Sequence, residues 1–118
     1  SAVLNYLNSC QMKGEEVNRA DVAASFQKAV TDVLTEHSLH AAESLGCRKF
    51  AIAGGVASNS SLRRAFEQEC AARGIEFFYP SPRYCTDNAA MIGAAGYYEY
   101  KRGVCHGYDL NAVPNLKL

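Results

Sequence analysis

Residues 49–88 read KFAIAGGVASNSSLRRAFEQECAARGIEFFYPSPRYCTDN. This stretch has the pattern of a strand, a glycine turn, a helix, a second strand, a loop and the start of a further helix. The first strand, at 49–53, is largely apolar, which is typical of a parallel strand buried on both faces. In parallel α/β folds, ligands bind at the carboxyl ends of strands and against helix N-termini. We therefore expect the loops that follow the two strands to carry the chemistry of the protein.

The first of these loops combines Gly54 and Gly55 with Ser58 and Asn59, at the start of a helix predicted over 59–73. Glycine removes side-chain obstacles, and helix N–H groups together with Asn or Ser side chains offer hydrogen-bond donors. The spacing is neither that of a dinucleotide-binding glycine motif nor that of a P-loop. By itself, the pattern favours a ligand-binding loop and a simple tight turn about equally.

The second loop follows a strand predicted over 75–79 and contains Cys85-Thr86-Asp87-Asn88. A carboxylate at the start of a helix is either an N-cap or, through its hard oxygen, a ligand of Mg, Mn, Fe or Zn. No histidine stands at ligand spacing from Asp87 in the sequence; the three are His37, His40 and His106. One carboxylate cannot hold a metal, so the partners of a metal at Asp87 would lie outside this chain.

Two further groups of side chains have simpler explanations. Cys85 lacks a visible activating base, so a nucleophilic role is disfavoured. The arginines of the helix at 59–73 are better explained by a solvated helix face than by a basic binding patch. They are Arg63, Arg64 and Arg73.

Helices are also predicted on the N-terminal side. One covers residues 1–12, and a long one runs from an N-cap at Asn18, with Asp21 in its first turn, to a stop at Gly46. Apolar residues at helical spacing predict the face of the long helix that lies on the sheet. They are Val22, Ala23, Phe26, Val30, Val33, Leu34, His37, Ala41 and Leu45, with Lys28, Asp32, Glu36 and Glu43 expected outside.

The last helix is predicted to begin at an N-cap on Thr86 or Asp87 and to end at Lys101-Arg102, before Gly103. Its two interior glycines, Gly93 and Gly96, each weaken a helix by about 1 kcal/mol relative to Ala. We expect them to let the helix backbone approach a strand or a ligand. Residues 104–118 show no periodicity and are expected to form a loop or a short docked tail.

Composition limits the classes of function. The chain has 118 residues with 12 basic and 12 acidic side chains, so its zero net charge gives no bulk attraction to nucleic acid or anionic lipid. Five irregularly spaced cysteines without a Cys-x-x-Cys pair indicate reduced thiols, and there is no membrane-spanning run or signal-peptide pattern. We expect a cytoplasmic protein with no membrane partner. Because helical register begins directly at Ser1, we also expect the chain to be cut from a longer polypeptide.

Together the two loops resemble a known family. The segments IAGGVASNSSLR (52–63) and PRYCTDNAAMIG (82–93) are similar to the C-terminal part of the bacterial tRNA threonylcarbamoyladenosine transferases, formerly labelled O-sialoglycoprotein endopeptidases or glycoproteases. The similarity covers essentially the whole chain, including AASFQ at 23–27. It implies an α/β fold of the actin-like (ASKHA, ribonuclease-H-like) ATPase type, with parallel strands flanked by helices. Residues 1–118 would form a single C-terminal lobe fragment of a longer protein, with 104–118 as its tail.

The resemblance also implies an activity and the residues that serve it. The family are acyltransferases that move a threonylcarbamoyl group from threonylcarbamoyl-adenylate to the adenosine next to the anticodon. On the matching positions, Asn59 with Gly54 and Gly55 would bind the nucleotide and Asp87 would bind metal, while no position matches a catalytic residue. The metal would be one divalent ion per full-length subunit, iron or zinc, shared with histidines absent from this chain. The family's usual glycine is Ala89 here, which leaves Asp87 intact.

The partners implied by the resemblance are threonylcarbamoyl-adenylate or an adenine nucleotide, tRNA through the full-length protein, and the partner proteins of a tRNA-modification complex. Without the first lobe, the fragment alone is expected to be inactive. Its uncovered strand edges and apolar faces are expected to let it self-associate. The alternative, from a different class, is a small stand-alone α/β interaction module with no catalytic role, in which both loops are purely structural.

Overall fold

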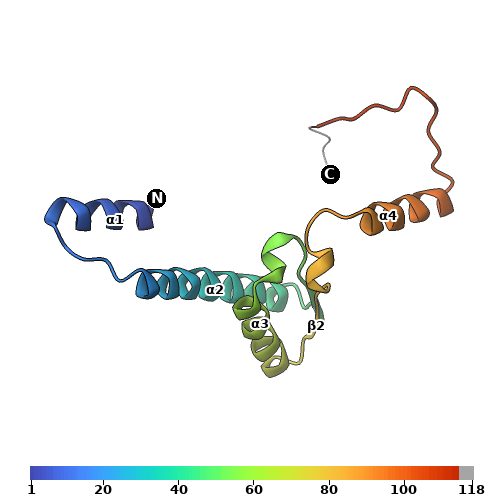
Figure 1. Cartoon of the computed structure of the whole chain (residues 1–118). Helices are drawn as coiled ribbons and strands as arrows, with labels where there is room; N and C mark the ends of the chain where they lie inside the picture. The colour runs from blue at the N-terminus through green and yellow to red at the C-terminus, as the bar shows by residue number, and fades with distance from the viewer. Residues whose placement is uncertain (115–118) are drawn as a thin grey trace. The chain divides into compact units, whose positions relative to one another are not determined.

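The structure, a computed structural model, describes residues 1–114 and divides into two units, Ser1–Cys85 and Thr86–Leu118. The first unit contains three helices, two strands and two 3-10 turns (Figure 1). In chain order they are α1 (Ala2–Lys13), α2 (Arg19–Ser44), β1 (Lys49–Ala51), η1 (Gly55–Ser58), α3 (Ser60–Ala72), β2 (Glu76–Phe78) and η2 (Pro82–Tyr84). The second unit contains α4 (Ala89–Lys101). Every predicted helix and strand is therefore present.

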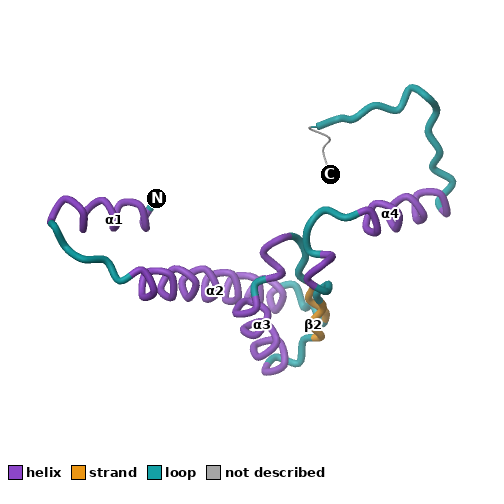
Figure 2. The backbone as a smooth tube through the Cα atoms, in the orientation of Figure 1, coloured by secondary structure: helices purple, strands orange, loops and turns teal. Residues whose placement is uncertain are grey.

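The two strands form a parallel sheet, as the sequence predicted. Phe50 of β1 lies opposite Phe77 of β2 in the register. The ring of Phe66, on α3, packs against both, with centroid distances of 4.9 Å to Phe50 and 5.6 Å to Phe77. Figure 2 shows α3 beside the strands that it connects. Parallel strands need such a crossover, and here it is a helix that packs on the face it crosses.

The core of the first unit lies where α3 meets α2 and β2. Its buried members are Leu39, Ala42, Leu62, Phe66, Cys70 and Ile75, with Phe50, Ile52 and Phe77 packed against them. Burial raises the pKa of the Cys70 thiol, so this cysteine stays protonated within the core. All five cysteines are free, as predicted.

The prediction that β1 is buried on both faces is wrong. Phe50 is partly buried, but its neighbours Lys49 and Ala51 are exposed. Alternate residues of a strand point to opposite faces, so α3 covers the Phe50 face and leaves the other open among the described residues. On the open face, Lys49 Nζ lies 3.7 Å from Glu76 Oε2.

The prediction for the buried face of α2 is also wrong. The side chains that α2 buries are Thr35, Leu39 and Ala42, whereas Phe26 and Leu45 remain 58% and 79% exposed. The helix carries apolar residues around much of its circumference, so periodicity alone does not choose one face. Contact with α3 makes that choice. The four polar residues expected outside are exposed.

The start of α2 and the end of α4 agree with the capping residues predicted from the sequence. Asn18 caps α2, because its Oδ1 accepts hydrogen bonds from the N–H groups of Ala20 and Asp21. α4 ends at Lys101, and Gly103 follows with a φ of 79°, as expected for a helix stop.

The interior of α4 and the residues after it are described within the second unit. A Cβ added at Gly93 or Gly96 would meet no atom within 4 Å, so their expected approach to a strand or ligand stays a prediction. Residues 104–114 form neither helix nor strand, as predicted, and the rest of the expected tail lies outside the described residues. No helix between residues 1 and 114 combines the length and the apolar character that crossing a bilayer requires.

Candidate functional site

The loop after β1, residues 54–59 (loop A), is a tight turn whose backbone requires one of its two glycines. Gly54 has φ 83° and ψ 176°, a conformation open essentially to glycine alone. Its carbonyl accepts the Ala57 N–H at 3.0 Å, and the Ser58 hydroxyl donates to the Gly55 carbonyl at 2.7 Å. Gly55 itself has no positive φ, and a Cβ added there would meet nothing within 4 Å. The turn therefore explains Gly54 but not Gly55.

Asn59 ends loop A and caps α3. Its Oδ1 accepts hydrogen bonds from Ser61 N–H at 3.0 Å and Leu62 N–H at 3.1 Å. The other end of the amide, Nδ2, makes no hydrogen bond within residues 1–114. Asn59 thus caps the helix through Oδ1, and its Nδ2 remains an unused donor among the described residues.

The loop after β2, residues 79–85 (loop B), contains the second 3-10 turn. Tyr84 N–H donates to the Ser81 carbonyl at 2.9 Å, and Cys85 N–H donates to the Pro82 carbonyl at 3.2 Å. The Cys85 side chain is buried at 4% exposure. Its sulfur accepts a hydrogen bond from Arg63 Nη2 at 3.2 Å. These contacts give the thiol a structural role.

The prediction that Arg63 lies on a solvated helix face is wrong. Its Nε donates to the Ala57 carbonyl of loop A, and its Nη2 donates to the Pro80 carbonyl of loop B at 2.9 Å. The other two arginines of this group, Arg64 and Arg73, are exposed as expected. One sequence signal could have revealed this role: Arg63 stands near the N-terminus of α3, where the helix dipole disfavours a cation by about 0.3–1 kcal/mol. A cation at that place needs acceptors, and two carbonyl groups provide them.

Asp87 belongs to the second unit and does not cap α4. The cap is Asn88, whose Oδ1 accepts the Met91 N–H at 3.0 Å, so the prediction of Thr86 or Asp87 as cap is wrong. The Asp87 carboxylate is exposed and makes no hydrogen bond or ion pair with any described residue. A free carboxylate suits a hard metal ion as one ligand.

The described residues do not complete a metal site. Within residues 1–114, no group of three or more His, Cys, Asp or Glu side chains is placed to hold a metal ion. The three histidines are all exposed: His37, His40 and His106. That the other ligands of a metal at Asp87 come from outside the chain stays a prediction.

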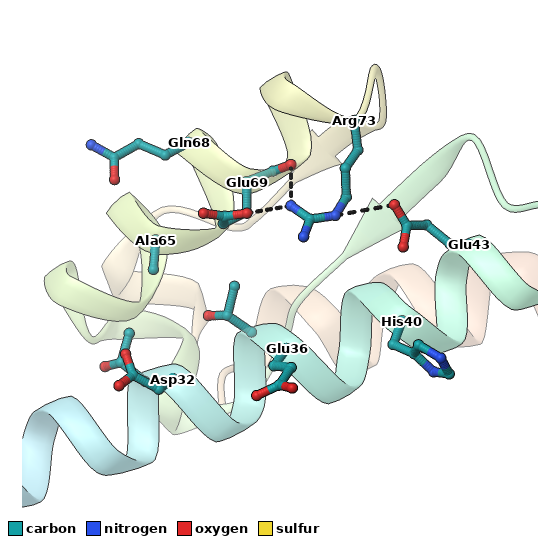
Figure 3. A pocket seen from close by; sticks show the side chains of 10 residues that line it. Asp32, Glu36, His40, Glu43, Ala65, Gln68, Glu69 and Arg73 are labelled. Atoms are coloured by element: carbon teal, nitrogen blue, oxygen red, sulfur yellow. Dashed lines mark hydrogen bonds and ion pairs between the residues drawn. The ribbon is translucent and has the colours of Figure 1, made fainter.

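A separate hollow of about 440 Å³ lies between α2 and α3. Figure 3 shows Arg73 reaching between Glu43 and Glu69, with its Nε 3.1 Å from Glu43 Oε1. Arg73 is exposed, as predicted, and also pairs with these two carboxylates. The Thr35 hydroxyl on the wall is buried and has no hydrogen-bond partner among the described residues. None of the site residues predicted from the sequence lines this hollow, so we place the candidate site at the strand ends instead.

Three of the predicted site residues come together at the end of β1: Gly54, Gly55 and Asn59. A glycine turn that meets a helix N-terminus at the carboxyl end of a parallel strand is the arrangement used by nucleotide-binding α/β proteins. The fourth predicted site residue, Asp87, belongs to the second unit.

Comparison with known proteins identifies the family. Residues 1–94 match the family model described as "TsaD: tRNA N6-adenosine threonylcarbamoyltransferase". Over all 118 residues, the chain is 59% identical to the tRNA N6-adenosine threonylcarbamoyltransferase of Clostridium botulinum (strain Kyoto / Type A2). The proteins of the same name from Clostridium beijerinckii and Clostridium kluyveri are 57% and 53% identical.

The chain belongs to the tRNA N6-adenosine threonylcarbamoyltransferase family, which confirms the resemblance seen in its two loops. In these alignments all of this chain is covered, but only 35% of each relative, so the chain spans about a third of the length of the curated relatives it matches. The parallel sheet with flanking helices agrees with the actin-like α/β fold expected of that family.

The two glycines of loop A should respond differently to the same substitution. Gly54→Ala should lower the free energy of unfolding by about 1–3 kcal/mol, because an L residue is strained in the conformation of Gly54. Gly55→Ala should stay within about 0.5 kcal/mol of wild type, since its backbone and surroundings admit a methyl group. Urea unfolding of the two full-length variants measures this, and equal losses would contradict the assignment of the turn to Gly54.

Proposed function

We propose that the full-length protein is a cytoplasmic tRNA N6-adenosine threonylcarbamoyltransferase, acting on the adenosine next to the anticodon. The observation that carries this proposal is 59% identity over all 118 residues to a relative of that name. In the reaction, the adenosine N6 amine forms a bond to the carbonyl carbon of threonylcarbamoyl-adenylate. The carbonyl C–O bond to the phosphate breaks, and AMP and a proton are released.

Within that protein, we infer that residues 1–118 form the C-terminal lobe, with 104–118 as a tail. The chain contributes a glycine turn and a capped helix N-terminus, but within residues 1–114 it offers only parts of a site. We therefore expect no transferase activity from this chain alone. The proposed partners of the full-length protein are tRNA and the proteins of a modification complex. Exposed apolar side chains such as Met12 and Phe26 support burial against another surface or a second copy.

The adenine nucleotide of the substrate would bind at loop A. Asn59 Nδ2 is a donor without a partner among the described residues, and the bare Cα of Gly55 leaves room for a ligand. The N-terminus of α3 adds the positive end of a helix dipole, which favours the phosphate of an adenylate. These residues bind and orient the nucleotide.

Asp87 would supply one ligand of a divalent metal, iron or zinc, whose histidine ligands lie outside this chain. The fit rests on its carboxylate, which is exposed and unpaired within residues 1–114. When bound, the metal supplies positive charge that polarises phosphate and carbonyl oxygens. The role of Asp87 itself is to hold that charge in place.

Substitution of Asn59 separates its capping role from its proposed binding role. Asn59→Asp keeps an oxygen that caps α3 but loses the N–H donor and places a negative charge near the nucleotide phosphate. Stability should stay within about 0.5 kcal/mol, while the Kd for AMP should rise by at least about tenfold. Asn59→Ala should lose both the affinity and about 1 kcal/mol of stability. Calorimetric titration with AMP checks this in the full-length protein, and wild-type affinity in Asn59→Asp would remove Asn59 from the site.

Substitution of Asp87 tests the metal proposal. Because Asn88 holds the cap, Asp87→Asn and Asp87→Ser should leave the thermal unfolding temperature of the metal-free full-length protein unchanged. Metal content and the rate of tRNA modification should fall by at least about 100-fold, since a charged oxygen ligand is lost. Metal analysis and a tRNA-modification assay measure the two effects. Wild-type metal occupancy and rate in both variants would show that Asp87 is no ligand.

A further inference from the structure

The side chain of Arg63 joins the two loops that follow the strands. Its Nε donates to the Ala57 carbonyl of loop A, and its Nη2 donates to the Pro80 carbonyl of loop B at 2.9 Å. The same Nη2 lies 3.2 Å from Cys85 Sγ, and the guanidinium carbon lies 4.5 Å from the centroid of the Tyr79 ring. One side chain therefore contacts loop A at one point and loop B at three.

Arg63 hydrogen-bonds to a backbone carbonyl of each loop, and the described backbone–backbone hydrogen bonds do not join loop A to loop B. The sheet makes its last bond from Ile52 N–H to the Phe78 carbonyl, at 3.0 Å, just before both loops begin. Beyond that point, the backbone bonds of each loop close its own 3-10 turn, as between Tyr84 N–H and the Ser81 carbonyl. The polar connection between the loops is therefore made by Arg63.

Arginine suits this position for physical reasons. Its planar guanidinium presents donors in a rigid fork and stays charged, so it can hold several acceptors while stacking on a ring. The ring is that of Tyr79, whose hydroxyl donates to Glu67 Oε1 at 2.6 Å and is thereby fixed. This hydrogen bond and the nearby Glu67 charge raise the pKa of Tyr79, which keeps the hydroxyl a donor. A lysine ammonium has neither the fork nor the flat face.

Arg63 is also tied to the residue proposed to bind the nucleotide. Its backbone N–H donates to the Asn59 carbonyl at 3.0 Å, and its side chain holds Ala57 two residues before Asn59. A ligand that fixes loop A therefore fixes the base of the Arg63 side chain and one of its acceptors. The remaining contacts of the guanidinium connect the ordered part of loop A to loop B.

We propose that Arg63 is a positioning residue that couples loop A to loop B, so that a nucleotide held at loop A also orders loop B. The ligand part of this inference rests on the proposed nucleotide site at Gly54, Gly55 and Asn59. Loop B leads directly into the segment that carries Asp87 in the sequence. The coupling therefore gives nucleotide binding a route to the segment that bears the proposed metal ligand.

Hydrogen exchange of the full-length protein tests the coupling without a ligand. In Arg63→Gln, the amides of Ala57, Tyr84 and Cys85 should exchange at least about tenfold faster, because charge-assisted hydrogen bonds are lost. Arg64→Gln, the same change at the exposed neighbour, should exchange like wild type. Amides of α2 around Leu39 should keep wild-type rates, since the core is untouched. Arg63→Lys, which keeps the charge, should give intermediate rates.

The same measurement with saturating AMP tests the transmission. In wild type, AMP should slow exchange in both loops, whereas in Arg63→Gln it should slow loop A and leave loop B unchanged. A purely structural role of Arg63 would not produce this separation of the two loops.

Three results would overturn the coupling: unchanged loop rates in Arg63→Gln, equal acceleration around Leu39, or AMP protection of loop B that survives in this variant. If AMP protects neither loop of the wild type, the proposed nucleotide site fails. The comparison without ligand still decides the coupling in that case, because its readout does not depend on nucleotide binding.

Discussion

The packing of Phe66 against Phe50 and Phe77 is the interaction on which the arrangement of the first unit depends. Phe66 is 2% exposed, and replacing a phenylalanine in such a core by alanine costs about 3–5 kcal/mol, a large share of a typical domain's stability. Because one helix residue touches both strands, α3 lies along the strand pair. The strands are parallel, so their carboxyl ends open toward the same edge. Loops A and B meet there, and the core thereby positions the candidate site.

At that edge, single residues serve both the fold and the proposed function. Asn59 caps α3 with Oδ1, and its Nδ2 is the donor proposed to bind the nucleotide. The backbone of the turn requires glycine at position 54 but not at position 55. Room for the proposed ligand is therefore the explanation left for Gly55. Arg63 stands in the first turns of α3, where the dipole disfavours a cation, and uses that place to reach both loops. The site is therefore built from the same contacts that end β1 and begin α3.

The sequence predicted those features that neighbouring residues determine. The element order, the cap at Asn18 and the stop at Gly103 depend on residues a few positions apart, and all are present. The glycine turn and the helix start at Asn59 were predicted for the same reason. The resemblance of the two loops led to the correct family, because their combined spacing is more specific than either loop alone.

The errors concern features set by distant residues. α2 buries Leu39 rather than Phe26 because α3 packs on that face, which helical periodicity cannot show. Arg63 was assigned to solvent because its acceptors at Ala57 and Pro80 become neighbours only after the strands pair. The cap of α4 is a closer case, since Asp87 and Asn88 are both good caps and the loop geometry selects Asn88.

The central claim is that loop A, held by α3 and Arg63 at the end of β1, binds the adenine nucleotide of the substrate. Its most direct test is an NMR titration of the isotope-labelled full-length protein with AMP, following the assigned backbone amides. The account predicts that the largest chemical-shift changes fall on Gly54, Gly55 and Asn59, with saturation at a single affinity. Saturable binding that shifts amides elsewhere and leaves these three unmoved would contradict it.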